Sequence, residues 1–270
     1  MKSVINSKKI MLIMITLLLF IPISVLLVWS FSRLWPSEAL FPNKLGLRGW
    51  SYLLSPRSKV FSSLAVSLFI SFVVTVLGLI LSIPAGKALG QLNFPGKNII
   101  EVLILAPIII PTITIGMGIH IVFIKWGLAD KILGVILVQL PLVLPYGVRI
   151  FASVFKALGE KWEEQAKTLK ANAWQGFWYV VFPLIRPGII GASILMFNVS
   201  FSQYFLTFLI GGGNVNTLPL LLFPFINGGD RVIASGIGLV FIIISLVFMF
   251  LLEKALGKGN DNSIGNFYYL

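Results

Sequence analysis

The chain of 270 residues is 57% hydrophobic and only 11% charged, with a mean hydropathy of +0.98. Soluble domains carry about 25% charged residues, so a chain this apolar cannot cover itself with polar surface, and we expect a lipid bilayer to be its main solvent. The absence of cysteine excludes disulfides, thiolate metal sites and cysteine catalysis. The net charge of +12 is spread along the chain rather than gathered into one patch, which argues against nucleic acid as a partner.

Residues 10–32 form the first run without charge. Lys2, Lys8 and Lys9 precede it as they would in a signal peptide, but no small-residue cleavage pattern follows it. A helix needs roughly 20 apolar residues to cross a bilayer. We therefore predict an uncleaved first transmembrane helix after a cytoplasmic N-terminus of residues 1–9.

Breaks in charge divide the remaining chain into five further predicted spans. These cover residues 60–86, 102–124, 132–148, about 188–209 and about 232–252. Between the last two, Gly211-Gly212-Gly213-Asn214 has turn chemistry, and residues 218–225 are predicted to be an apolar loop or re-entrant segment. The predicted fold class is an all-α membrane protein, with six transmembrane helices within residues 10–252 and a C-terminal tail over residues 253–270.

The basic residues predict the orientation of these spans. Most of the 21 Lys and Arg residues fall on the side that holds both termini, and the positive-inside rule places that side in the cytoplasm. Residues 31–59 would then form the main external loop, in which Trp35, Trp50 and Tyr52 suit a membrane interface.

Prolines interrupt two of the predicted spans. Pro107 and Pro111 lie in the third span and Pro141 and Pro145 in the fourth. Each proline removes a backbone donor, which lipid tolerates only where neighbouring helices or water satisfy the freed carbonyl group. Two explanations stay open, namely packing within a bundle and the shaping of a pathway through it. His120, the only histidine, is interpreted as a packed or interfacial residue rather than a ligand.

Polar side chains gather in and just after the fifth span. Such groups at membrane depth usually face protein or a water-filled cavity. They are interpreted either as hydrogen-bonding groups between helices or as the lining of a translocation path, and the candidates for the path are Asn198, Ser202, Gln203 and Tyr204.

The segment between the fourth and fifth spans is amphipathic. Trp162, Ala166 and Leu169 fall at helical spacing and would share one apolar face. Glu163 stands four residues before Lys167, which is the favourable order for an ion pair on a helix. A first short helix is therefore predicted here.

A second short helix is predicted to follow Asn172. Asn172 can cap this helix while Gln175 returns the bond. Two short helices in the cytoplasm have no reason to expose large apolar side chains such as Trp174 and Phe177 unless a partner docks there.

This segment resembles the EAA loop of binding-protein-dependent ABC importer permeases, which reads E-A-A, three residues, G, nine residues, I-x-L-P. Glu164-Gln165-Ala166 stands at the opening triplet, Lys170 at the glycine, Val180 at the isoleucine and Phe182-Pro183 at the closing Leu-Pro. Residues 184–189 also resemble the usual continuation. The resemblance covers essentially the whole chain. The segments 67–90, 106–118 and 200–213 are similar to the matching helices of the polyamine, thiamine and iron branch of the family.

The resemblance implies a type I ABC importer permease of the bacterial inner membrane, with a cytoplasmic two-helix coupling loop over about residues 153–186. It implies three kinds of protein partner, which are an ABC ATPase dimer, a second permease subunit (identical or paralogous) and an external solute-binding protein. The chain would form half of the pathway for a small polar solute.

The resemblance also implies roles for individual residues. Glu164 would contact the ATPase, and the apolar residues of the loop would pack into a groove of that subunit; the alternative for Glu164 is a solvated charge paired with Lys167. The residues expected to couple the permease to the ATPase are Trp162, Glu164, Ala166, Leu169, Lys170, Trp174 and Pro183.

Lys170 departs from the family pattern, because a left-handed backbone at the turn is inexpensive only for glycine. Either Lys170 adopts that conformation or the turn is built differently, around Asn172.

The chain contains no G-x-x-x-x-G-K-[ST] phosphate loop. We therefore expect a transport subunit without catalytic residues, metal or other cofactor. The alternative hypothesis is an ion- or proton-coupled secondary carrier that needs no ATPase, although no charged relay runs through the spans. A third is a membrane anchor or assembly factor that does not transport.

Overall fold

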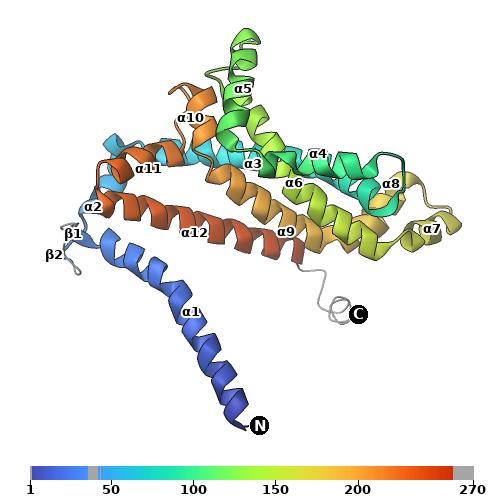
Figure 1. Ribbon diagram of the computed structural model, residues 1–270, viewed down its shortest axis with the longest axis horizontal. Helices are drawn as coiled ribbons and strands as arrows, with labels where there is room; N and C mark the ends of the chain where they lie inside the picture. The colour runs from blue at the N-terminus through green and yellow to red at the C-terminus, as the bar shows by residue number, and fades with distance from the viewer. Residues whose placement is uncertain (1, 36–41, 43, 258–270) are drawn as a thin grey trace. The chain divides into compact units, whose positions relative to one another are not determined.

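The computed structural model describes residues 2–35, 42 and 44–257, and these are mostly helical (Figure 1). Most of the predicted C-terminal tail lies outside the described residues. The chain divides into two compact units, one made of residues 1–63 and 220–244 and the other of residues 64–219 and 245–270. Each unit has its own packing.

The first unit joins segments from both ends of the chain. It contains α1 (Lys2–Ser30), the antiparallel strands β1 (Ser32–Leu34) and β2 (Lys44–Leu45), α2 (Arg48–Leu53) and the 3-10 turn η1 (Pro56–Ser58). Most of α11 (Leu218–Asn227) and the first half of α12 (Arg231–Leu256) complete it.

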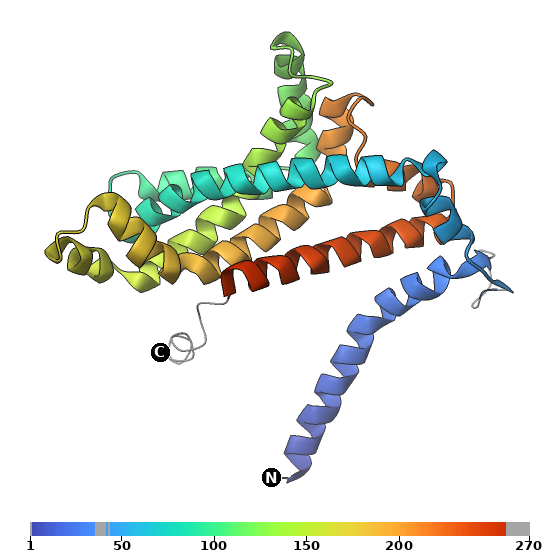
Figure 2. The ribbon, with the colours of Figure 1, turned by 180° about the vertical axis from the view of Figure 1, so that it is seen from behind.

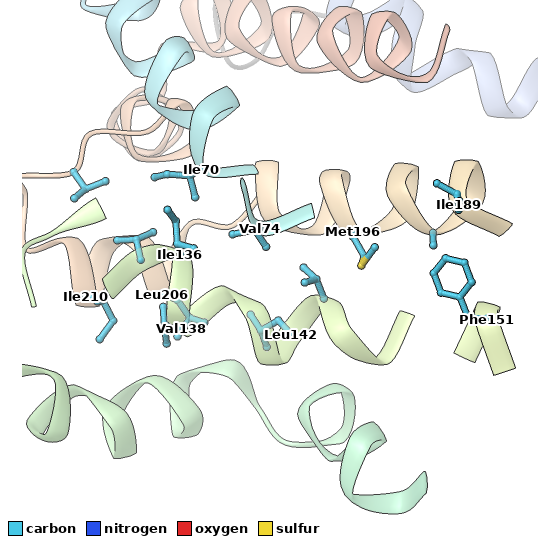
Figure 3. Packing of buried hydrophobic residues seen from close by; sticks show 14 of the residues in the cluster. Ile70, Val74, Ile136, Val138, Leu142, Phe151, Ile189, Met196, Leu206 and Ile210 are labelled. Carbon is cyan, nitrogen blue, oxygen red and sulfur yellow. The ribbon is translucent and has the colours of Figure 1, made fainter. Parts of the chain in front are cut away.

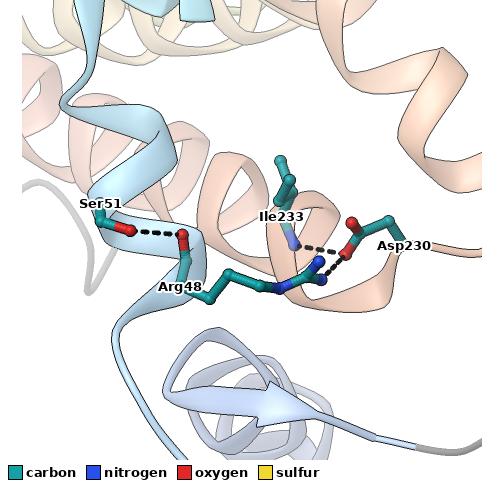
Figure 4. Close-up of polar contacts among 4 residues, drawn as sticks. All are labelled: Arg48, Ser51, Asp230 and Ile233. Atoms are coloured by element: carbon teal, nitrogen blue, oxygen red, sulfur yellow. Dashed lines mark hydrogen bonds and ion pairs between the residues drawn. The ribbon is translucent and has the colours of Figure 1, made fainter.

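An ion pair connects α2 to the start of α12 within this unit. Arg48 Nη2 lies 2.6 Å from Asp230 Oδ1, and the same oxygen accepts a hydrogen bond from the backbone N–H of Ile233 at 3.3 Å (Figure 4). Asp230 therefore caps α12, since a carboxylate satisfies donors that a helix N-terminus leaves free.

The aromatic residues predicted for a membrane interface all have ring partners. Trp35 packs edge-on against Trp29, Trp50 lies against Phe31, and Tyr52 packs edge-on against Phe225. Their placement at a membrane surface stays a prediction.

The second unit is a bundle of helices. It contains most of α3 (Val60–Gln91), α4 (Lys97–Ile109), α5 (Thr112–Lys125), α6 (Ile132–Leu158), α7 (Lys161–Thr168), α8 (Ala173–Gln175), the π-helical turn η2 (Gly176–Val181), α9 (Phe182–Phe201) and α10 (Phe205–Gly211). α6 and α9 pack along each other, and α10 packs against α5 and α6. Val74, Phe151, Met196 and Leu206 belong to the apolar core that joins α3, α6, α9 and α10 (Figure 3).

The end of α3, the helix that crosses the view from behind (Figure 2), approaches α6 at backbone distance. A methyl group on Gly90 would lie 2.6 Å from the carbonyl oxygen of Ala152 and 3.0 Å from the backbone nitrogen of Lys156. One turn earlier, a methyl group on Gly86 would lie 2.9 Å from the nitrogen of Ala152. Small residues of this kind let helices in a membrane pack closely.

Four helices in the described part of the chain are long and apolar enough to cross a membrane, and a fifth if a bent pair counts as one span. They are α3, α6, the continuous helix over residues 173–201 and α12. Residues 16–30 of α1 form a shorter apolar helix, so the predicted count of six spans stays a prediction.

The third predicted span is not one straight helix. α4 and α5 meet at an angle of 98° across a short break. Pro111 explains the break, because a residue before proline is pushed out of the helical region, and Ile110 has an extended backbone with ψ of 130°. The span predicted over residues 102–124 was expected to be disturbed at Pro107 and Pro111; the structure breaks it at Pro111, while Pro107 lies inside α4.

The fourth and fifth spans differ from their predicted bounds. α6 continues past Arg149 to Leu158, with Pro141 and Pro145 inside an unbroken helix. α9 begins earlier than predicted and ends at Phe201, and the polar residues 202–204 separate it from α10. Residues 218–225, predicted to be a loop or re-entrant segment, belong to the short helix α11.

We predict that Gly90→Ala lowers the stability of the chain, because the added methyl group meets the backbone of α6 rather than a flexible side chain. Overpacking of this kind costs about 1–3 kcal/mol. Thermal unfolding of the purified protein in detergent measures the effect. The control is Gly191→Ala, where a methyl group meets nothing within 4 Å and the better helix former adds up to about 1 kcal/mol; equal midpoints for the two variants would contradict the prediction.

Candidate coupling surface and translocation path

The EAA-like loop (about residues 153–186) begins with α7, whose side chains divide between the interior and the surface. Ala166 is buried with 6% exposure and faces Gly176. Trp162, Glu164 and Leu169 are exposed, the last at 83%. The expectation that Ala166 packs into a partner's groove is therefore corrected, because this side chain already packs inside the loop.

Glu163 does not pair with Lys167 as predicted. Its carboxylate oxygen Oε2 lies 2.7 Å from Lys87 Nζ at the end of α3. Within the described residues Glu164 forms no ion pair, so the alternative in which Glu164 pairs with Lys167 is not found.

The turn after α7 answers the question about Lys170. The N–H of Ala171 donates to the carbonyl of Ala166 at 3.0 Å and that of Lys170 to Lys167 at 2.9 Å. This pattern is a Schellman motif, in which the residue that follows the C-cap of the helix has a left-handed backbone. Lys170 supplies it with φ of 60°, so the lysine adopts the conformation that glycine has at low cost.

The second helix of the loop begins as predicted but does not end as predicted. Asn172 Oδ1 accepts from the N–H of Gln175 at 2.8 Å, and Gln175 Oε1 accepts from the N–H of Asn172 at 3.0 Å, which confirms the predicted capping box. The chain then runs through η2 into α9 as one helix over residues 173–201. Pro183 explains the wide turn, because its ring would clash with a carbonyl of a regular helix and it donates no hydrogen bond.

The surface of this second helix is aromatic. Trp174 is 70% exposed and packs edge-on against Trp178. Tyr179 is 80% exposed. Trp162 of α7 and Leu169 just after it are exposed as well. The exposed large apolar side chains of the loop are together called the aromatic surface below; they are Trp162, Leu169, Trp174, Trp178 and Tyr179.

The four residues predicted for a translocation path have different surroundings. Asn198 Oδ1 accepts from Ser245 Oγ of α12 at 2.7 Å, and Asn198 Nδ2 donates to the carbonyl of Ile194 at 2.9 Å. This is the packing role that the sequence left open. Ser202 is exposed, Gln203 lines a small polar crevice, and Tyr204 stacks on Phe208.

Gln139 of α6 is a polar residue that the sequence analysis missed. It is 1% exposed, donates through Nε2 to Thr207 Oγ1 at 3.0 Å and accepts from Ser200 Oγ at 2.6 Å. Gln139 thereby ties α9 and α10 together across their break. A single glutamine two residues before Pro141, in an otherwise apolar span, was the signal that could have found it.

Comparison with known families decides what this arrangement is. The chain matches the family described as "Binding-protein-dependent transport system inner membrane component" over residues 78–255, most of its length. It belongs to this family. The matched part of the permease includes α6, the whole EAA-like loop and α9.

Individual relatives are consistent with this result. The permease is 28% identical over 202 residues to the molybdate/tungstate transport system permease protein of Pyrococcus furiosus, with 75% of this chain and 80% of the relative covered. It is 23% identical to the sulfate transport system permease protein of Escherichia coli, covering 94% and 93%. Its fold is similar to a chain of a bacterial ABC transporter involved in import of alginate, with a TM-score of 0.71 at 17% identity and coverage of 93% and 95%.

The permease is thus an ABC importer subunit that carries out transport rather than catalysis, and it is a multi-pass membrane protein. Its relatives include permeases named for the transport of molybdate and of sulfate. The polyamine branch suggested by its sequence is not confirmed.

We predict that Lys170→Gly stabilises the EAA-like loop, because it removes the cost of a left-handed lysine, about 1 kcal/mol. Lys167→Gly is the matched control: the same change, three residues earlier and inside α7, should destabilise the loop by about 1 kcal/mol. Hydrogen exchange of the amides in residues 161–175 reads both effects. Faster exchange in both variants would show that the left-handed turn carries no strain.

Proposed function

We propose that this permease forms half of a translocation pathway for a small polar solute, which an external binding protein delivers and a separate ATPase dimer drives. The single observation that carries the proposal is the aromatic surface of the EAA-like loop. Trp174 and Leu169 are 70% and 83% exposed, although both lie on a segment that is rigidly capped and hydrogen bonded.

Hydrogen bonds fix both turns of the loop, so we expect the loop to move as one body. The Schellman motif ends α7, the capping box starts the next helix, and that helix runs without interruption into α9. A subunit that binds the aromatic surface would therefore displace α9 as a whole. Glu164, exposed beside this surface, is the residue that we assign to a polar contact with the ATPase, and Lys170 and Pro183 maintain the shape of the loop.

The pathway would require a second permease subunit, because one chain supplies one half. We place the polar lining near the break between α9 and α10, where Ser202 is exposed and Gln203 borders the crevice around Gln139 and Thr207. Tyr204, stacked on Phe208, lies in the same break. We assign Asn198 to packing between helices.

The solute class can be narrowed by chemistry and by relatives. The polar groups at the break are hydroxyl and amide groups without charge, which bind a solute through hydrogen bonds rather than ion pairs. Relatives named for molybdate, tungstate and sulfate make tetrahedral oxyanions the first solutes to test. Labelled molybdate and sulfate, offered with the binding protein to proteoliposomes that hold the complete transporter, would show uptake only when ATP is enclosed with the ATPase.

We predict that Trp174→Ala weakens binding of the ATPase by at least about tenfold, since buried tryptophans at interfaces often contribute 2 kcal/mol or more. Trp126→Ala is the matched control, because Trp126 is exposed to nearly the same extent, 71%, at the end of α5. Co-purification of the ATPase with each variant measures the difference. Equal retention by both variants would remove the aromatic surface from the docking site.

We predict that Glu164→Ala abolishes ATP-dependent uptake, because it removes the polar contact with the ATPase that we assign to Glu164. The chain should stay in the membrane at its normal level, because Glu164 has no ion pair to lose among the described residues. Uptake into proteoliposomes and the amount of chain in washed membranes are measured together. Uptake by the chain without any ATPase would instead favour a secondary carrier and contradict the proposed function.

A further inference from the structure

A second connection runs from the EAA-like loop to α3. Lys87 Nζ lies 2.7 Å from Glu163 Oε2, and the two side chains are 41% and 25% exposed. One helical turn later on α3, Gln91 Nε2 donates to the carbonyl oxygen of Gly159 at 2.7 Å. The two bonds hold both ends of the segment that leads from α6 into α7.

Apolar packing between α3 and the loop is interrupted on this side. A cavity of about 200 Å³ lies between Lys87, Glu163 and the second helix of the loop at Gly176 and Phe177. Another of about 360 Å³ lies between Ile83, Pro84 and the same helix at Phe177 and Val181. Atoms that face a gap lose their dispersion contacts, so the polar bonds of Lys87 and Gln91 add to an incomplete apolar contact between α3 and the loop.

The end of α3 is itself held firmly against α6. Gly86 and Gly90 bring its backbone against Ala152 and Lys156. A displacement of α7 that reaches Lys87 therefore moves the end of α3 together with α6, because no flexible side chain separates the two helices there.

We propose that Lys87 and Gln91 are positioning residues that transmit movement of α7 to α3 during transport. This role rests on the proposed function, since it requires an ATPase that moves the loop. The aromatic surface then drives α9 through the continuous helix, while Glu163 and Gly159 drive α3 through an ion pair and a hydrogen bond. Two of the long apolar helices of the second unit would thus respond to one docking event.

Charge exchange tests the ion pair. The variants are Lys87→Glu, Glu163→Lys and the double exchange, each assembled with the ATPase and binding protein in proteoliposomes. Each single exchange should reduce the solute moved per ATP hydrolysed by roughly 5- to 10-fold, the lower end of the range that an energetic coupling between sites usually covers. The double exchange should return to within about twofold of the original protein, because the pair is restored with opposite polarity. The ATPase should co-purify with all three.

Lys97→Glu is the matched control for charge. Lys97 lies ten residues after Lys87 in the chain. Among the described residues, its Nζ bonds only to the carbonyl of Leu92. The Lys97→Glu variant should move the normal amount of solute per ATP hydrolysed. Normal yield in the single exchanges, or no recovery in the double exchange, would overturn the inference while leaving the proposed function intact. Failure of the unmodified protein to bind an ATPase would instead overturn the proposed function.

A distance measurement covers variants that accumulate poorly. The chain has no cysteine, so spin labels can be placed at Leu92→Cys and Thr168→Cys, both exposed, without first removing native cysteines. Their separation should stay narrowly distributed with and without ATP. In the milder Lys87→Met background the distribution should broaden when ATP binds, and an unchanged narrow distribution would contradict a transmitting role for Lys87.

Discussion

Every backbone N–H and C=O group at membrane depth needs a partner within the protein, because lipid offers none. The prolines of this permease are the places where that constraint shapes the fold. Pro111 divides the third predicted span into α4 and α5, which meet at 98°. Pro183 widens one turn into η2, yet the helix continues. Pro141 and Pro145 stay inside α6, where the close packing of α9 supports the helix.

Polar side chains gather where the helices are interrupted. At the break between α9 and α10, side chains bond to nearby backbone groups. Thr207 Oγ1 donates to the carbonyl of Gln203 at 3.0 Å. Ser202 Oγ donates at 2.7 Å to the carbonyl of Asn198, which also accepts from the backbone N–H of Ser202. Gln139 completes this network from α6. These are the groups that we propose to line the pathway.

The EAA-like loop combines an exposed apolar surface with a rigid base. Ala166 faces inward and lets the two helices of the loop approach, while Trp174 and Leu169 face outward. The left-handed Lys170 fixes the angle between the helices through the Schellman motif. A partner that binds such a surface moves a body of fixed shape, and the continuous helix into α9 passes that movement to the membrane.

Features that depend on local spacing could be predicted from the sequence. The EAA-like pattern, the capping box of Asn172 and Gln175, and the long apolar helices α3 and α12 all follow from residues that are near one another in the chain. Contacts between distant segments could not be predicted in this way: Glu163 bonds to Lys87 rather than Lys167, Asn198 bonds to Ser245, and Gln139 joins α9 to α10. Each of these choices depends on which distant helix lies alongside, and helix packing, unlike helix formation, is not encoded by neighbours in the chain.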